Sequence, residues 1–155
     1  YNNGFAISVP QEKQMAIQDL SDRAAGYGFP GFAVDGTDFL KTYQAVQNAI
    51  KRARDPAGGP TFLELKIERL KPHTSDDDDR RYRTAESLQA SLLQDPLVKF
   101  RNYLCEIGIL TPQKEKEIEE ITKREINTAT EAAESASWPD PSTLLAHLYA
   151  PQDGS

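Results

Sequence analysis

Short apolar segments recur along the first half of the chain and predict three strands. They cover residues 5–9, 31–36 and 61–67, are rich in β-branched and aromatic side chains, and are bounded by glycine or proline. We expect the first to be the end of a buried strand. The spacing of apolar residues predicts helices over 15–26 and 38–53. Strands that alternate with helices indicate βαβ units and a largely parallel sheet, in which ligands bind where strands end.

The second half of the chain combines one polar segment with longer helical patterns. We expect a polar loop over 71–84 and helices over 96–107 and 111–137, followed by a short helix in the tail. The apolar positions of the long helix and the tail are Ile118, Ile121, Ile126, Ala129, Ala133, Leu144, Leu145, Leu148 and Tyr149. We therefore predict an α/β part at 1–90 and a helical extension at 91–155 that packs on the same domain.

Composition narrows the class of protein. The chain has 155 residues, of which 38% are hydrophobic and 27% charged, so we expect a folded domain and not a disordered segment. The net charge of -6 argues against nonspecific binding to nucleic acid or to an anionic membrane, since both attract basic surfaces. No apolar run approaches the length needed to span a bilayer. We expect no nucleic-acid or membrane partner.

The single cysteine and the first residue support predictions about the cell compartment and about the length of the parent sequence. Cys105 excludes a disulfide within the chain and favours a reducing compartment, the cytoplasm or, in a eukaryote, the mitochondrial matrix. We expect Cys105 to be a small core residue and not a reactive thiol. Because the chain opens on Tyr1 and not on methionine, we expect it to be cut from a longer sequence.

Two polar segments carry candidate chemistry. Residues 2–8 read Asn-Asn-Gly-Phe-Ala-Ile-Ser, and amide or backbone carbonyl oxygens suit a Mg²⁺ ion that also holds a phosphate. Taken alone, Asn-Asn-Gly is more often a simple turn. Residues 69–83 read Arg-Leu-Lys-Pro-His-Thr-Ser-Asp-Asp-Asp-Asp-Arg-Arg-Tyr-Arg, in which His73 is placed to meet a phosphate or carboxylate. The alternatives are a solvated charge run and a loop that closes on itself through pairs such as Asp77 with Arg83.

These segments, together with a third between them, resemble a known family. Residues 2–8 resemble the end of the thiamine-diphosphate motif. Gly-Phe-Pro-Gly at 28–31 with Val-Asp-Gly-Thr-Asp at 34–38, and then Pro-His-Thr-Ser at 72–75, resemble two further motifs in the same order and spacing. The family is the alpha subunit of thiamine-diphosphate-dependent 2-oxoacid dehydrogenases of the branched-chain or pyruvate type. The branched-chain type is slightly nearer because of the Asp-rich loop, which points to branched-chain amino acid degradation.

The resemblance, which extends over 1–149, implies a fold and a reaction. The fold is α/β, a three-layer thiamine-diphosphate-binding fold with a mostly parallel sheet, partial here, and a helical C-terminal extension. Residues 1–90 are then the C-terminal part of the cofactor-binding domain. The reaction is oxidative decarboxylation of a 2-oxoacid and transfer of the acyl group to a lipoyl group.

The resemblance also assigns residues. Asn3 binds Mg²⁺ through its side-chain oxygen and Phe5 through its backbone carbonyl, although the family usually has tyrosine at that position. His73 meets the diphosphate and is the catalytic residue toward the lipoyl group. The loop is ordered by four residues, which are Arg69, Asp77, Tyr82 and Arg83. Thr74 stands where animal branched-chain enzymes carry a regulatory serine, so control by a kinase at that position is doubtful.

The main departure is that the Gly-Asp-Gly element that grips the diphosphate is absent from these residues. We therefore expect an incomplete site that needs the N-terminal half of the alpha subunit, a beta subunit in a heterotetramer, and the lipoyl acyltransferase core. The alternative is a non-catalytic split subunit that acts as an assembly scaffold through its long helix and tail. We further expect residues 71–84 to be mobile without the cofactor and ordered with it.

Overall fold

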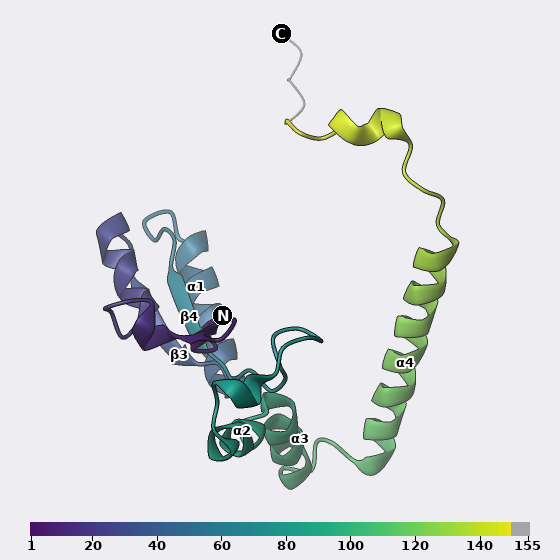
Figure 1. Ribbon diagram of the computed structural model, residues 1–155, viewed down its shortest axis with the longest axis horizontal. Coiled ribbons are helices and arrows are strands. Elements are labelled where there is room, and N and C mark those ends of the chain that lie inside the picture. The colour runs from purple at the N-terminus through teal and green to yellow at the C-terminus, as the bar shows by residue number, and fades with distance from the viewer. Residues whose placement is uncertain (150–155) are drawn as a thin grey trace. The chain divides into compact units, whose positions relative to one another are not determined.

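The computed structural model describes residues 1–149 and divides the chain into two compact units, 1–109 and 110–155 (Figure 1). The predicted division at 90 and 91 stays a prediction, and its last residues, 150–155, lie outside the described part. The first unit contains all the strands that the structure describes and both candidate polar segments. It is therefore the unit in which a site has to be sought.

The centre of the first unit is a βαβ element. Strands β3 (Gly31–Asp35) and β4 (Phe62–Lys66) pair in parallel in a register that joins Gly31 to Phe62 and Asp35 to Lys66, and helix α1 (Phe39–Arg54) connects them. Helix α1 begins after Asp38, whose carboxylate accepts a hydrogen bond from the Lys41 N–H. Both predicted strands and the predicted helix are confirmed, as is the parallel pairing.

Different helices cover the two faces of this pair of strands. Side chains alternate along a strand, so Gly31 and Glu64 share one face, and Phe32 and Leu63 share the other. The 3-10 helix η2 (Leu20–Tyr27) packs on the face of Gly31 so closely that a Cβ there would come 2.1 Å from the Ser21 carbonyl oxygen. Helix α1 lines a cleft with the side chains of the other face. The fold is mixed α/β around a small parallel sheet.

The N-terminal segment differs from the prediction of a buried strand over 5–9. Two-residue strands β1 (Phe5–Ala6) and β2 (Val9–Pro10) pair antiparallel around a tight turn in which Ile7 has a φ of 57°. The side chains of Ile7 and Val9 are largely exposed. An apolar run does not show whether the residues form one strand or the two strands of a hairpin. Here they form a hairpin with a turn between Ala6 and Val9. The segment just before, at Asn2, forms a parallel bridge to Lys66 of β4.

The helix predicted over 15–26 is also wrong in its first half. Only the short 3-10 helices η1 (Gln11–Lys13) and η2 form in this stretch. The Gln18 carbonyl instead accepts a hydrogen bond from the Gln11 side chain at 2.7 Å. The Ser21 N–H donates to the Glu64 carboxylate at 3.0 Å. Contacts with other segments thus replace the helical hydrogen bonds that the apolar spacing predicted.

Helices complete the first unit after β4. Short η3 (Asp79–Arg81) and helix α2 (Ala85–Leu92) were not predicted, whereas α3 (Pro96–Glu106) agrees with the predicted helix over 96–107. Thr84 caps α2 by accepting from the Ser87 N–H. Cys105 is exposed on α3, so its predicted place in the core is wrong.

The second unit, taken by itself, is helical. Helix α4 (Pro112–Ser135) begins after its cap Thr111, and η4 (Pro141–Leu145) follows in the tail, as predicted. The apolar stripe on α4 and the tail leucines are exposed in this chain. Among residues 1–149 no helix is both long and apolar enough to cross a membrane.

Candidate functional site

The site is built at the carboxyl ends of the parallel strands. The Asn2 N–H donates to the Leu65 carbonyl and the Asn2 carbonyl accepts from the Ile67 N–H, both at 2.8 Å, so the turn after Asn2 starts level with the end of β4. The polar loop leaves from the same end of β4. The two segments that the sequence singled out are therefore neighbours, as expected for a parallel sheet.

Asn3 and Phe5 present oxygen atoms along one edge of β1. The Gly4 carbonyl accepts from the Gln11 N–H, and the next position, Phe5, lies opposite Pro10, which has no N–H to donate. In an antiparallel ladder the backbone groups of Phe5 therefore point away from β2. The Phe5 N–H donates to Asn3 Oδ1 at 3.1 Å, which places the asparagine oxygen on that same edge.

The Phe5 ring joins this turn to the polar loop. Its centroid lies 5.9 Å from the Tyr82 ring, and the guanidinium carbons of Arg69 and Arg83 lie 5.3 Å and 5.5 Å from it. A cation over an aromatic face is attracted by the ring quadrupole. Arg69 also donates to the Ile7 carbonyl at 2.7 Å, so it contacts both a backbone carbonyl and the Phe5 ring of this segment.

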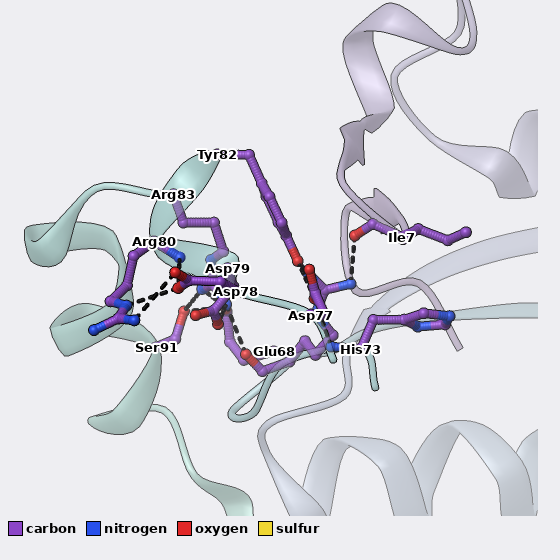
Figure 2. A network of polar contacts seen from close by, with 11 residues as sticks. Ile7, Glu68, His73, Asp77, Asp78, Asp79, Arg80, Tyr82, Arg83 and Ser91 are labelled. Carbon is purple, nitrogen blue, oxygen red and sulfur yellow. Dashed lines mark hydrogen bonds and ion pairs between the residues drawn. The ribbon is translucent and has the colours of Figure 1, made fainter. Parts of the chain in front are cut away.

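A chain of hydrogen bonds runs from Arg69 into the loop (Figure 2). Arg69 donates to the Tyr82 hydroxyl at 2.6 Å, and that hydroxyl donates to the Asp77 carboxylate at 2.6 Å. The same carboxylate oxygen accepts the His73 N–H at 2.8 Å. These donors, Tyr82 first, hold the pKa of Asp77 below the usual aspartate value. Burial and the bond to Asp77 raise the pKa of Tyr82.

A second network fixes the base of the loop. The Arg83 side chain is 2% exposed and donates to the Arg69 carbonyl at 2.8 Å and to Ser91 Oγ at 2.6 Å, and Ser91 donates to Glu68 at 2.6 Å. Its nearest carboxylates are Asp79 at 3.9 Å and Glu68 at 4.0 Å. The predicted pairing of Asp77 with Arg83 is therefore wrong, because each has a different partner.

Sequence reasoning missed the three residues that complete this network, Glu68, Asp79 and Ser91. Asp79 and Ser91 are buried, whereas a run of four aspartates suggested only a solvated surface. The signal for Asp79 was its distance of four residues from Arg83 within one helical turn. No local signal links Ser91 to Glu68, because they are separated by 23 positions.

The tip of the loop is exposed, in contrast with its base. His73 and Thr74 are both exposed, and the His73 side chain extends away from the Arg80–Arg83 end of the loop in Figure 2. Asp78 and Arg80 form an ion pair at 2.7 Å on the surface, which lowers the pKa of Asp78. The imidazole thus remains available to a ligand.

An open cleft of about 880 Å³ lies beside the turn. Asn3, Phe5 and Arg83 line it together with residues of β4 and α2. Within the part of the chain that the structure describes, no three histidine, cysteine, aspartate or glutamate side chains gather as a metal site. Amide and carbonyl oxygens such as those of Asn3 and Phe5 are of the kind that hard cations bind.

A comparison with protein families finds a match that covers nearly the whole chain. The family model described as "Dehydrogenase E1 component" matches residues 1–142, which include the turn, the sheet and the loop. The chain belongs to this family. The predicted resemblance is thus confirmed at the level of the dehydrogenase E1 family.

Curated relatives in this E1 family carry two kinds of name. The chain is 44% identical over 149 residues to the "2-oxoisovalerate dehydrogenase subunit alpha" of Bacillus subtilis, covering 96% of this chain and 45% of the relative. It is 41% identical over 150 residues to the "Pyruvate dehydrogenase E1 component subunit alpha" of Staphylococcus epidermidis, covering 96% of this chain and 40% of the relative. The chain therefore spans less than half the length of these relatives.

Proposed function

We propose that this chain is part of the decarboxylating component of a 2-oxoacid dehydrogenase complex. In that component a 2-oxoacid is oxidatively decarboxylated and its acyl group passes to a lipoyl group. The observation that carries the proposal is the meeting of the Asn2–Phe5 turn and the Asp-rich loop in a chain of the E1 family. The relatives' names point to 2-oxoacids as the substrate class.

Thiamine diphosphate with Mg²⁺ is the cofactor that we propose for this site. Asn3 Oδ1 and the Phe5 carbonyl are hard oxygen donors on one edge of β1, and a carbonyl ligand does not need the tyrosine hydroxyl found elsewhere in the family. The bound cofactor supplies an electron sink for decarboxylation. The protein's share here is to hold the metal at Asn3 and Phe5.

His73 is the residue that we propose acts on the reacting group. Its imidazole is exposed at the tip of a loop whose base contacts the turn, so it can reach a ligand held there. It would contact the diphosphate and face the channel through which the lipoyl group arrives. The two ring nitrogens of an imidazole can serve as a hydrogen-bond donor and an acceptor, which suits it to assist acyl transfer. Arg69, Asp77, Tyr82 and Arg83 would keep the loop in the productive position.

Assembly follows from the same proposal. Many apolar side chains are exposed in this chain, among them Phe32, Tyr43 and Ile118 at 54%, 57% and 55%. Surfaces of this kind are covered by other protein in an assembly. We propose that the N-terminal half of the alpha subunit completes the three-layer thiamine-diphosphate-binding fold. A beta subunit would form a heterotetramer with the alpha subunit, and the lipoyl acyltransferase core would bind the whole.

The alternative, a non-catalytic scaffold, draws its support from the exposed stripe on α4 and from the exposed tail. Complementation separates the two functions. The chain is mixed with the remainder of the alpha subunit, the beta subunit, thiamine diphosphate and Mg²⁺. We expect decarboxylation of a 2-oxoacid in the catalytic case. Assembly without decarboxylation would favour the scaffold.

A sharper test uses His73→Ala in the complete enzyme. Acyl transfer to lipoamide should fall much more than decarboxylation measured with an artificial electron acceptor, because Asn3 and Phe5 still hold the metal. His147→Ala is the matched control, since that histidine lies in the tail, and it should leave both rates unchanged. A His73→Ala enzyme unimpaired in both assays would remove His73 from the site.

A further inference from the structure

Glu64 is a buried carboxylate in the middle of a strand, where an apolar side chain would be the ordinary choice. It is 3% exposed and points from β4 toward the face that η2 covers. One oxygen accepts from Asn2 Nδ2 at 2.6 Å and the other from the Ser21 N–H at 3.0 Å. Burial of a carboxylate is costly unless such donors satisfy it, so both contacts matter to the fold.

Asn2 is the partner that connects Glu64 to the metal turn. Its side-chain nitrogen donates to Glu64 and also to Gln11 Oε1 at 2.7 Å, and its oxygen accepts from the Gly4 N–H at 2.9 Å. Both N–H groups of the Asn2 amide are thereby used, and its oxygen has a partner as well. The amide of the adjacent Asn3 accepts from the Phe5 N–H and faces the cleft. The two asparagines therefore have different roles, one in support and one toward a ligand.

We propose that Glu64, acting through Asn2, is the positioning residue that sets the place of Asn3 Oδ1 and the Phe5 carbonyl for the metal. The inference rests on the proposed function, because it takes that turn as the Mg²⁺ site. The physical reason is that the turn has only two-residue strands of its own, while Glu64 ties it to the sheet from 62 positions away. Without this tie the turn keeps the backbone hydrogen bonds of Asn2 and the contact of Arg69, but the Asn2 side chain that accepts from the Gly4 N–H is no longer fixed. The metal oxygens that follow it then lose part of their order before the metal binds.

Three variants separate positioning from other effects. Glu64→Gln keeps the size but offers one acceptor where two donors converge. Asn2→Asp sets a carboxylate against Glu64, which repels it and releases the turn. The double variant E64Q/N2D restores the pairing between positions 2 and 64, because the new amide can donate to the new carboxylate while its oxygen still accepts from the Ser21 N–H. Only the contact of position 2 with Gln11 Oε1 is not restored. Asp38→Ala is the stability control, since it removes the cap of α1 and leaves the turn intact.

The measurement is Mn²⁺ affinity by electron paramagnetic resonance, with Mn²⁺ in place of Mg²⁺ and saturating thiamine diphosphate, in the complete enzyme with its beta subunit. Groups that orient a metal ligand without touching the metal contribute about 10–100-fold to metal affinity. Each single variant should therefore weaken Mn²⁺ binding by that order. The double variant should recover most of the loss, and Asp38→Ala should bind as the wild type does. Thermal unfolding of every variant checks the fold.

Each outcome has one meaning. A purely electrostatic effect of Glu64 would make Asn2→Asp bind Mn²⁺ more tightly, and that result overturns positioning. Single variants with wild-type affinity, or a double variant without recovery, overturn it as well. If Asn2→Asp does not assemble, Glu64→Gln against Asp38→Ala decides alone. Wild-type enzyme that binds no Mn²⁺ with thiamine diphosphate refutes the proposed function itself, which is a distinct result.

Discussion

The turn at 2–5 and the loop at 71–83 differ in how they are held. The turn is tied to β4 by two backbone hydrogen bonds and by the buried Glu64. The loop has buried charged side chains at its base, Arg83 and Asp79, while residues 71–76 at its tip are exposed and are joined to the base through Asp77 and Tyr82. The comparison teaches that the turn, which we propose as the metal side of the site, is built into the sheet, whereas the His73 side is placed by a few side chains.

The energetics of the loop follow from that difference. Ordering a residue costs roughly 1–2 kcal/mol of backbone entropy, and an exposed ion pair returns on the order of 0–1 kcal/mol. The surface pair of Asp78 with Arg80 therefore cannot order the tip. The buried contacts of Arg83 and Asp79 at the base can do so. The exposed parts of the loop, residues 71–76 together with Arg80 and Arg81, should therefore depend on a ligand, whereas the buried contacts should not.

The largest expected effect is on the free energy of unfolding, when the buried contacts at the base of the loop are removed. Arg83→Ala removes a side chain that is 2% exposed and leaves Asp79 buried without its cation. Removing one partner from a buried pair costs on the order of 3 kcal/mol, and we expect unfolding of the chain in urea to show a loss of that size. Arg80→Ala, in the same loop but on the surface, is the control and should show almost none. Equal effects of the two would erase the distinction between base and tip.

Asn3→Ala tests the turn side. It removes an oxygen that we assign to Mg²⁺, and loss of a metal ligand should weaken Mg²⁺ binding in the presence of thiamine diphosphate by at least the roughly 10–100-fold that a supporting partner contributes. Asn48→Ala, on the exposed surface of α1, is the matched control. Calorimetric titration in the complete enzyme measures both. An unchanged affinity in Asn3→Ala would show that the turn does not bind the metal.

Tyr82→Phe tests the link between base and tip. It keeps the ring contact with Phe5 but removes the hydroxyl that accepts from Arg69 and donates to Asp77. Of these two hydrogen bonds, the one to Asp77 joins the base to the tip, and its loss corresponds to a factor of about five in a local opening equilibrium. We expect proteolysis within the loop to speed up by that factor. Tyr43→Phe, exposed on α1, should leave the rate as it was.

The smallest effect is on pH dependence. Because the pKa of Asp77 is lowered in the folded loop, its stabilisation is complete above the ordinary aspartate value of 3.8 and is lost as pH falls through the lowered pKa. In the complete enzyme with bound cofactor, exchange of the His73 amide hydrogen, corrected for intrinsic pH effects, should stay slow at neutral pH and accelerate only in acid. Acceleration that begins near neutral pH would assign the protection to another group.

How far sequence reasoning reached depends on how local each feature is. Strands β3 and β4, together with α1, were predicted to within about one residue at the strand ends. Each of these elements shows its own pattern of apolar residues in the local sequence. The hairpin of β1 and β2 was missed because five apolar-rich residues do not reveal a turn in their middle. Helix α2 was missed although Thr84 with Glu86 after it is a usable start signal.

The candidate site divides in the same way. The resemblance singled out Arg69, Tyr82 and Arg83, and the structure places all three against the Phe5 ring. Asn3 Oδ1 accepts the Phe5 N–H, and the metal-binding roles of Asn3 and Phe5 stay proposals. Their partners were not found, because the contacts of Glu64 with Asn2 and of Ser91 with Glu68 join distant segments. Patterns identify groups that bear chemistry, whereas the supports of those groups depend on the tertiary fold.

The most direct test of the account is tryptic cleavage after Arg80 and Arg81, both exposed in the loop, in the complete enzyme with and without thiamine diphosphate and Mg²⁺. Lys71 is followed by a proline, so the loop is read at these two arginines. If the turn and the loop form one cofactor site, the cofactor should slow cleavage there and leave cleavage after Arg54 on α1 unchanged. Equal cleavage of the loop with and without cofactor would contradict the account.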